Sequence, residues 1–296
     1  MSLRSALSAI VVAVFVLAGA APVTAQPKTE LHQCVPADLR EDAITFKAED
    51  GVELPGLVFG SGSSGVLLAH TQTETVCEWL PLARQLADDG HQVLLYEMRS
   101  LRLRENRHSY DLDVLGAARE LDSRGVSSII AGGAGTGAAA IAAVAEKVPG
   151  LRGMFLLTPF EGFHTSSADL DAVTGIRAVQ VPSFIVAAQD DVIESKSEDV
   201  EDTRLADHAR QVAGAASNAR LEIVPGSARF AKLVEDGALR DQVRAFVREN
   251  RAAPTFLERW LMPIAGGVVL LVLAVVVVLR RRSRRSTTVA EVSAGS

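Results

Sequence analysis

The sequence has few of the residue patterns that hold metal ions. Only two cysteines occur in the 296 residues, and none of the six histidines lies in an H-x-H or H-E-x-x-H motif. No group of carboxylates has the spacing of metal ligands either. We therefore predict no metal site and no metal-assisted hydrolysis. Internal repeats and long low-complexity tracts are also absent from the sequence.

The amino-terminal end carries an apolar segment typical of protein export. Residues 1–25 have the pattern of a signal peptide: Arg4 lies in a short basic region, an apolar run covers 9–20, and residues 23–25 form a small-x-small motif. We expect cleavage near Ala25. An uncleaved anchor is the alternative, although the apolar run is short for a membrane span of about 20 residues.

A second apolar segment, Leu261–Leu279, contains no charged residue and is close to the ~20 residues that cross a bilayer. We predict a single transmembrane helix there, with a buried core helix as the alternative. Trp260 suits the membrane interface, and five arginines lie in the tail 280–296. The positive-inside rule then places that tail in the cytoplasm and residues 26–253 outside. Residues 250–260 form a tether.

This topology divides the net charge of −6 unevenly. The tail carries five arginines and one glutamate, and the signal peptide carries one arginine, which leaves −11 on the exported part. An acidic exported domain argues against nucleic acid as a partner. The basic tail is suited to anionic lipid headgroups, so the membrane is a partner that we expect.

Both cysteines, Cys34 and Cys77, lie in the part that we predict to be exported. In an oxidising compartment an even pair indicates one disulfide, here joining the amino-terminal segment to the first long helix. Two free buried thiols are the alternative.

Apolar runs bounded by turn residues alternate along residues 43–249, which follow an amino-terminal segment, 26–42. The runs 43–48 and 52–59 are joined across Glu49-Asp50-Gly51 and predict a hairpin. Strands that alternate with helices of ten or more residues indicate right-handed crossovers. We predict a doubly wound α/β domain with a mostly parallel sheet covered on both faces. The other predicted strands are 65–69, 92–96, 127–131, 153–157, 183–187 and 221–224, and the predicted helices are 78–89, 111–121, 136–148, 170–177, 203–212 and 233–247.

The stretch Ile129–Ala140 runs from β-branched residues through a glycine-rich turn into an alanine-rich helix. The spacing from Gly133 to Ala138 nominally fits the G-x-G-x-x-A pattern of a dinucleotide-binding turn. However, this turn follows several strands instead of the first one, and no acidic residue directly follows the next strand, 153–157. We therefore predict no nicotinamide or other cofactor.

Residues 40–250 resemble the α/β-hydrolase superfamily in the order of their motifs. In that superfamily a serine lies in a G-x-S-x-G turn between a strand and a helix, an acid follows a later strand, and a histidine follows the last one. Here Gly133–Gly137 (GAGTG) occupies the turn, Ala188–Asp191 (AQDD) is similar to the acid loop, and Val224–Arg229 (VPGSAR) is similar to the histidine loop. The resemblance implies a lidless fold of the dienelactone-hydrolase or small-esterase type, acting on ester or acyl bonds.

Carried over residue by residue, the resemblance implies an incomplete catalytic triad. Gly135 stands at the nucleophile position and Arg229 at the histidine position, so only Asp191, at the acid position, matches. Glycine supplies no nucleophile, and arginine cannot act as a base because its pKa stays above ~12. We interpret the site as inactive by the Ser-His-Asp mechanism. Asp191 can instead pair with Arg229, whose guanidinium fits a carboxylate.

Two further segments supply candidate binding residues. His70 and Thr71 lie in Leu67–Thr71, which is similar to the superfamily's oxyanion-hole loop, and Leu95–Arg99 is similar to its strand ending in D-x-R-G. His70 acts at the site or, as we favour, simply holds the loop backbone. Thr136 follows the nucleophile position, where the superfamily uses the backbone N–H as an oxyanion donor, so its hydroxyl is a poor replacement nucleophile.

Three functions stay open from the sequence. We favour a membrane-tethered inactive protein that binds an envelope partner or a small acyl or anionic ligand, with Arg229 and N–H groups of the turn as anion ligands. An active hydrolase using Thr136, or water activated by Asp191, is one alternative. A structural or assembly scaffold of the cell envelope is the other, since a fold alone does not fix function.

Overall fold

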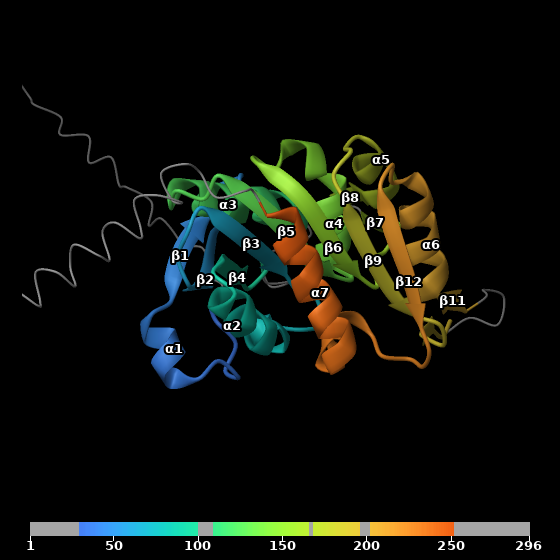
Figure 1. Ribbon diagram of the computed structural model, residues 1–296, viewed down its shortest axis with the longest axis horizontal. Helices are drawn as coiled ribbons and strands as arrows, with labels where there is room; N and C mark the ends of the chain where they lie inside the picture. Colours follow the sequence, from blue (N-terminus) through green and yellow to red (C-terminus); the bar gives the residue numbers. More distant parts are fainter. Residues whose placement is uncertain (1–29, 100–108, 166–167, 196–201, 252–296) are drawn as a thin grey trace, which may run out of the picture.

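A computed structural model of the chain describes residues 30–99, 109–165, 168–195 and 202–251. Its centre is an eight-stranded sheet with the order β1-β2-β4-β3-β5-β6-β9-β12 (Figure 1). β1 pairs antiparallel with β2, and β2 pairs antiparallel with β4, whereas the other neighbours are parallel. The strands are β1 (Ile44–Lys47), β2 (Glu53–Phe59), β3 (Ser64–Ala69), β4 (Gln92–Tyr96), β5 (Ser128–Ala134), β6 (Leu151–Leu157), β9 (Ser183–Ala188) and β12 (Ala219–Val224).

The predicted hairpin and mostly parallel sheet are confirmed. Gly51 closes the hairpin with a φ of +85°, a conformation that favours glycine. The central strands β4, β5 and β9 are buried at every residue, which explains why their sequences are continuously apolar instead of alternating. A sheet of this kind needs a layer of helices on each face.

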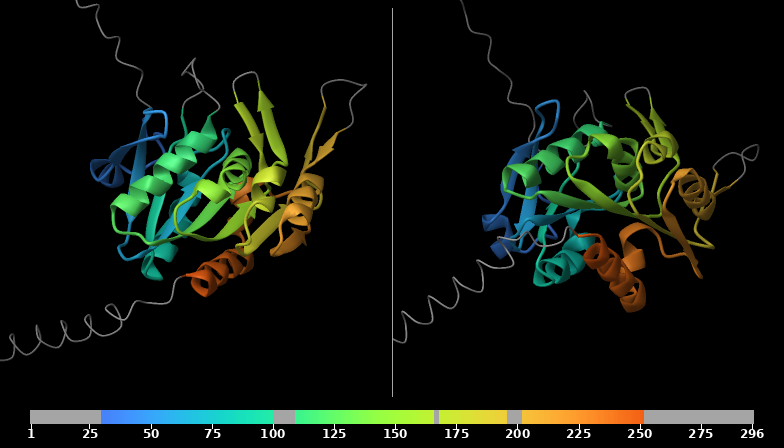
Figure 2. Two further views of the ribbon diagram at one scale, coloured as in Figure 1. Left: turned by 90° about the horizontal axis from the view of Figure 1, so that it is seen from above. Right: turned by 45° about the horizontal axis from the view of Figure 1, so that its top comes forward.

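Helices form those two layers, as the views in Figure 2 show. One apolar core lies under α3, α4, α5 and α6, and the second lies under α2, α7 and the short 3-10 helix η3. The helices are α1 (Ala37–Glu41), α2 (Leu80–Asp88), α3 (Tyr110–Ser123), α4 (Thr136–Ala143), α5 (Ala172–Arg177), α6 (Leu205–Ala215) and α7 (Gly237–Asn250), with 3-10 helices η1 (Val76–Trp79), η2 (Ala145–Lys147) and η3 (Phe230–Glu235).

Several predicted helix boundaries are wrong for local reasons. The predicted helix 233–247 begins at Gly237, because the Asp236 side chain accepts from the N–H groups of Ala238 and Leu239 and residues before it form η3. The predicted helix 136–148 ends at Ala143, after which the chain tightens into η2.

Two small hairpins replace the starts of other predicted helices. Thr203–Arg204 form β11, which pairs with β10 (Val192–Ile193), so the predicted helix 203–212 begins only at Leu205. Likewise β8 (Ala168–Asp171) pairs with β7 (Gly162–Thr165) and precedes α5. Both hairpins project from the carboxyl edge of the large sheet, where the candidate site lies.

A buried ion cluster fixes the β1–β2 hairpin to α3. The Arg99 guanidinium is fully buried and donates to Asp113 Oδ1 over 2.8 Å and to Asp50 Oδ2 over 2.8 Å. Its backbone N–H donates to Asp113 Oδ2 over 3.0 Å. Arg99 therefore satisfies one carboxylate from the hairpin turn and one from the first turn of α3.

Small residues bring α4 against the end of β3. A Cβ atom at Gly137 would lie 2.4 Å from the His70 carbonyl oxygen, so only glycine permits this approach. As a result the turn before α4 lies next to the loop that follows β3. That contact positions the candidate site.

The predicted membrane segments lie outside the described residues, namely the signal peptide 1–25, most of the tether 250–260, the transmembrane segment 261–279 and the tail 280–296. Within the described ranges, no helix combines the length and apolarity that a membrane span needs.

Candidate functional site

The glycine turn lies between β5 and α4, as the sequence predicts. Gly135 has φ +52° and ψ −116°, which is the left-handed region that favours glycine. Its N–H donates to the Leu157 carbonyl at the end of β6 over 3.0 Å. The backbone thus makes a sharp strand-to-helix turn of the kind that holds the nucleophile in α/β hydrolases.

The space above Gly135 is filled by two other side chains. A Cβ atom built on Gly135 would lie 2.6 Å from Thr71 Oγ1 and 2.7 Å from Phe230 Cε1. The ring of Phe230 is buried and packs edge-on against Phe160 at 6.0 Å. A serine side chain at position 135 therefore has no room unless Thr71 and Phe230 move.

Phe230 is held in place by its backbone as well as by packing. Its φ is +56°, which is unusual for a residue with a side chain, and its N–H donates to Thr158 Oγ1 over 3.2 Å. Thr158, at the end of β6, is itself fully buried with φ +46°. Two strained residues that support each other thus fix the aromatic ring over the turn.

Thr71 also accepts a hydrogen bond from the backbone N–H that would serve as an oxyanion donor. The Thr136 N–H donates to Thr71 Oγ1 over 3.3 Å, and the two hydroxyl oxygens lie 3.3 Å apart. Both threonines are buried. The structure therefore brings the two candidate residues Thr71 and Thr136 together and pairs them with each other.

Asp191 and Arg229 meet at the carboxyl end of β9, as the sequence suggested. Arg229 Nε donates to Asp191 Oδ1 over 2.6 Å, and Nη2 contacts the same oxygen and the Val192 carbonyl. The Asp191 side chain is fully buried, whereas that of Arg229 is 37% exposed. Among the described residues, no donor reaches the second oxygen of Asp191.

A cavity of 630 Å³ lies on the outer side of this pair. Its charged lining residues in the described ranges are Asp190, Asp191, Glu194, Asp202, Arg229 and Lys232, so carboxylates outnumber cations by four to two among them. Gly135, Thr71 and Thr136 are not among its lining residues. The residues of the turn therefore do not line the cavity, and the charge of its described lining does not favour an anion.

His70 is tied to the neighbouring strand instead of the turn. Its Nε2 lies 3.1 Å from Glu97 Oε2 and 3.1 Å from Met98 N, and Nδ1 lies 2.7 Å from the Thr71 carbonyl oxygen. Burial by itself would lower the pKa of His70, but the hydrogen bond and charge of Glu97 outweigh it and raise that pKa. These contacts give His70 a role in holding the loop.

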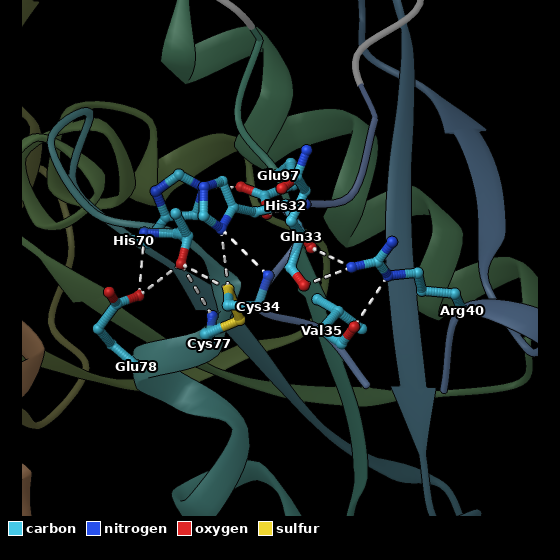
Figure 3. The surroundings of a disulfide bond; sticks show 10 residues. His32, Gln33, Cys34, Val35, Arg40, His70, Cys77, Glu78 and Glu97 are labelled. Atoms are coloured by element: carbon cyan, nitrogen blue, oxygen red, sulfur yellow. Dashed lines mark hydrogen bonds and ion pairs between the residues drawn. A yellow bond between two sulfur atoms is a disulfide. The ribbon is translucent and has the colours of Figure 1, made fainter. Parts of the chain in front are cut away.

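The predicted disulfide is confirmed: Cys34 and Cys77 are bonded, with their Cα atoms 6.2 Å apart (Figure 3). Cys77 lies in η1, one turn before the long helix that we expected to carry it. The disulfide fixes a segment whose His32 N–H donates to Glu97 Oε1 over 3.0 Å. The amino-terminal segment is thus bound to the same carboxylate as His70.

Sequence reasoning missed Glu74, which lies beside η3. Its Oε2 is buried, and no donor in the described part of the chain reaches that oxygen. Burial and the nearby charge of Glu78 raise the pKa of Glu74 to about 7, even though the Ala231 N–H opposes this. The only signal in the sequence was its position four residues after His70. Over the described ranges, no group of three acidic, histidine or cysteine side chains could hold a metal ion.

No family model and no curated protein sequence matches this chain. Solved structures do match. The esterase domain of a Rhodothermus marinus protein has a TM-score of 0.54 at 15% identity and covers 70% of this chain and 97% of its own. An esterase from Rhodococcus sp. ECU1013 has a TM-score of 0.57 at 12% identity, with coverage of 71% and 99%.

A Pyrococcus furiosus esterase has a TM-score of 0.57 at 14% identity and covers 76% of this chain and 97% of its own. At these identities the likeness concerns the fold, since one fold hosts many functions. The sheet order, the crossovers and the turn at Gly135 agree with that likeness. The chain has the α/β-hydrolase fold.

Proposed function

We propose that this chain is a membrane-tethered α/β-hydrolase-fold protein that has no esterase activity and acts by binding a partner at the cell envelope. The observation that carries the proposal is the filled turn. Phe230 and Thr71 occupy the space that a catalytic serine side chain would need above Gly135. The missing nucleophile and the missing space support the same conclusion.

The remaining groups do not supply an alternative mechanism. Arg229 stands where a base would pair with Asp191, and a guanidinium accepts no proton. The Thr136 hydroxyl is buried against Thr71, so it is not presented to a substrate. The Thr136 N–H donates to Thr71 Oγ1, so it is not directed at an oxyanion.

A protein partner has more support than a small acyl or anionic ligand. Binding at the turn would require the volume that Phe230 fills, and two donor groups of Arg229 are engaged by Asp191 and the Val192 carbonyl. The neighbouring cavity carries more carboxylates than cations. Surfaces outside the turn are therefore the better candidates for binding.

The membrane tether is proposed from the sequence. α7 ends at Asn250, and ten residues separate it from the apolar segment 261–279, after which five arginines lie within 280–285. The disulfide between Cys34 and Cys77 supports an oxidising compartment for the folded domain. Together these features favour a domain outside the cell membrane and a short cytoplasmic tail.

The test of inactivity uses the full chain in detergent micelles. We expect neither hydrolysis of short-chain 4-nitrophenyl esters nor labelling by a fluorophosphonate probe. Gly135→Ser with Arg229→His should stay inactive, because Phe230 still covers position 135. Adding Phe230→Gly and Thr71→Ala removes both side chains that fill the space above position 135, so measurable hydrolysis is expected first in this quadruple variant. Hydrolysis or labelling of the wild-type chain would contradict the proposal.

A further inference from the structure

The two edges of the large sheet differ in how they are protected. β1, at one edge, has four residues and ends on the exposed Lys47, and short strands with lysine resist pairing with other chains. β12 lies at the other edge (Figure 1) and has six residues with no proline. Within the described ranges β12 pairs only with β9, so its outer side has no strand beside it.

The hydrogen bonds to β9 identify which groups of β12 point outward. The carbonyl groups of Asn218 and Val224 accept from β9 and the residue that follows it. Because the N–H and C=O of one residue point to the same side of a strand, and successive residues alternate, Ala219, Leu221 and Ile223 direct theirs away from β9. These three residues can form a ladder with another strand.

The side chains of β12 are complementary to a second copy of the same strand. Arg220 and Glu222 lie on the α7 face with opposite charges, where Arg220 Nη2 also contacts Gln242. Leu221 lies on the other face and is one of two large apolar side chains exposed in the described structure, at 37%. An antiparallel pair with Leu221 opposite Leu221 places each Arg220 opposite the other copy's Glu222.

We propose that the chain forms a twofold homodimer in which β12 pairs antiparallel with β12 of a second copy, with the axis at Leu221. In this register Leu221 faces itself as a hydrogen-bonded pair, and Ala219 faces Ile223. Arg220 and Glu222 form the closer non-hydrogen-bonded pairs, where opposite charges stabilise and like charges destabilise. The interface is isologous, as closed dimers require.

The same symmetry suits a membrane-bound protein. The twofold axis of two antiparallel edge strands in one continuous sheet runs perpendicular to that sheet, so both copies present α7 on the same face. α7 is the last described helix and leads toward the predicted segment 261–279. Both copies can therefore enter one bilayer, and confinement there raises their effective concentration.

A single introduced cysteine tests the register in the full chain, in native membranes. The only two natural cysteines are joined in a disulfide, so the new thiol has no competitor. Leu221→Cys should give a covalent dimer on mild oxidation, because facing Cα atoms about 5.5 Å apart suit a disulfide. Arg220→Cys should give at least fivefold less, because position 220 faces position 222 of the other copy.

A charge exchange in the Leu221→Cys background tests the pairing itself. Arg220→Glu should reduce the dimer at least fivefold, and adding Glu222→Arg should restore it. Arg84→Glu, at an exposed position on α2, makes the same charge change and should have no effect. Cooperative thermal unfolding of each variant shows that it is folded.

Three results would overturn the dimer: equal cross-linking at positions 220 and 221, no restoration by the charge exchange, or cross-linking of position 221 to a different protein. The inference names a second copy as a partner of the proposed binding protein but rests on the edge strand alone. Esterase activity in the wild-type chain would therefore refute the proposed function and leave the dimer standing.

Discussion

An ion cluster and an ion pair at the carboxyl edge of the sheet differ in how completely their charged groups are hydrogen-bonded. At the ends of β4 and α3, Arg99 donates to both carboxylates that it meets, and its side chain is fully buried. At the end of β9, Arg229 is 37% exposed and leaves one oxygen of Asp191 without a donor in the described structure. The Arg99 cluster stabilises the fold, whereas Asp191 and Arg229 stand at the positions of the acid and the histidine in a catalytic triad.

The backbone of the glycine turn and the side chains around it differ in a similar way. Gly135 keeps the sharp conformation of a nucleophile turn, yet the groups around it pack against each other. Thr71 Oγ1 accepts from the Thr136 N–H, and Phe230 fills the remaining volume above Gly135. A fold can therefore retain the geometry of a catalytic turn while the neighbouring side chains exclude a substrate.

The largest effect on stability is expected from breaking the buried Arg99 cluster. Arg99→Met leaves Asp113 buried without its counter-ion, and breaking a buried pair on one side costs about 3–5 kcal/mol. We expect the free energy of unfolding to fall by about 4 kcal/mol in urea, with the buried Trp79 as the fluorescent reporter. A loss under about 1 kcal/mol would show that the cluster does not hold the hairpin to α3.

The next effect concerns the filled turn. Gly135→Ser places a Cβ atom against Thr71 and Phe230 and forces a side chain into a positive φ, so it should cost about 2–3 kcal/mol. Phe230→Ala in the same chain should recover part of this cost, with a coupling of about 1–2 kcal/mol between the two sites in a double-mutant cycle. Simple additivity would mean that the ring does not occupy the serine position.

Sequence patterns predicted the backbone of this site well, and they predicted its packing poorly. GAGTG and VPGSAR mark local turns after strands, so they placed Gly135 and Arg229 correctly relative to the sheet. The position of the Phe230 ring depends on contacts with Thr158 and Phe160, which lie some 70 residues away along the chain. No local pattern encodes such a contact.

A smaller effect is expected at the ion pair of Arg229 and Asp191. Arg229→Met removes the partner of Asp191, but it also opens that carboxylate to water from the adjoining cavity. The loss should therefore be about 1–2 kcal/mol, clearly less than for Arg99→Met measured in the same urea titration. Equal losses would remove the distinction between the cluster and the pair.

The smallest effect tests the half-buried carboxyl of Glu74 through pH. Its pKa is raised from 4.5 in the unfolded chain to about 7, so the folded state binds the proton more tightly. The stabilisation from this group is therefore complete below pH 4.5 and is lost as the pH rises through 7.

Glu74→Gln keeps an oxygen for the Ala231 N–H and carries no charge, so this part of the pH dependence should disappear. At pH 8 the variant should be more stable than the wild type by about 1 kcal/mol, a value reduced for solvent screening of a partly exposed group. Glu249→Gln, on the exposed face of α7, controls for the loss of one negative charge. If the stability difference between Glu74→Gln and the wild type is the same at pH 5 and pH 8, Glu74 is not the group with the raised pKa.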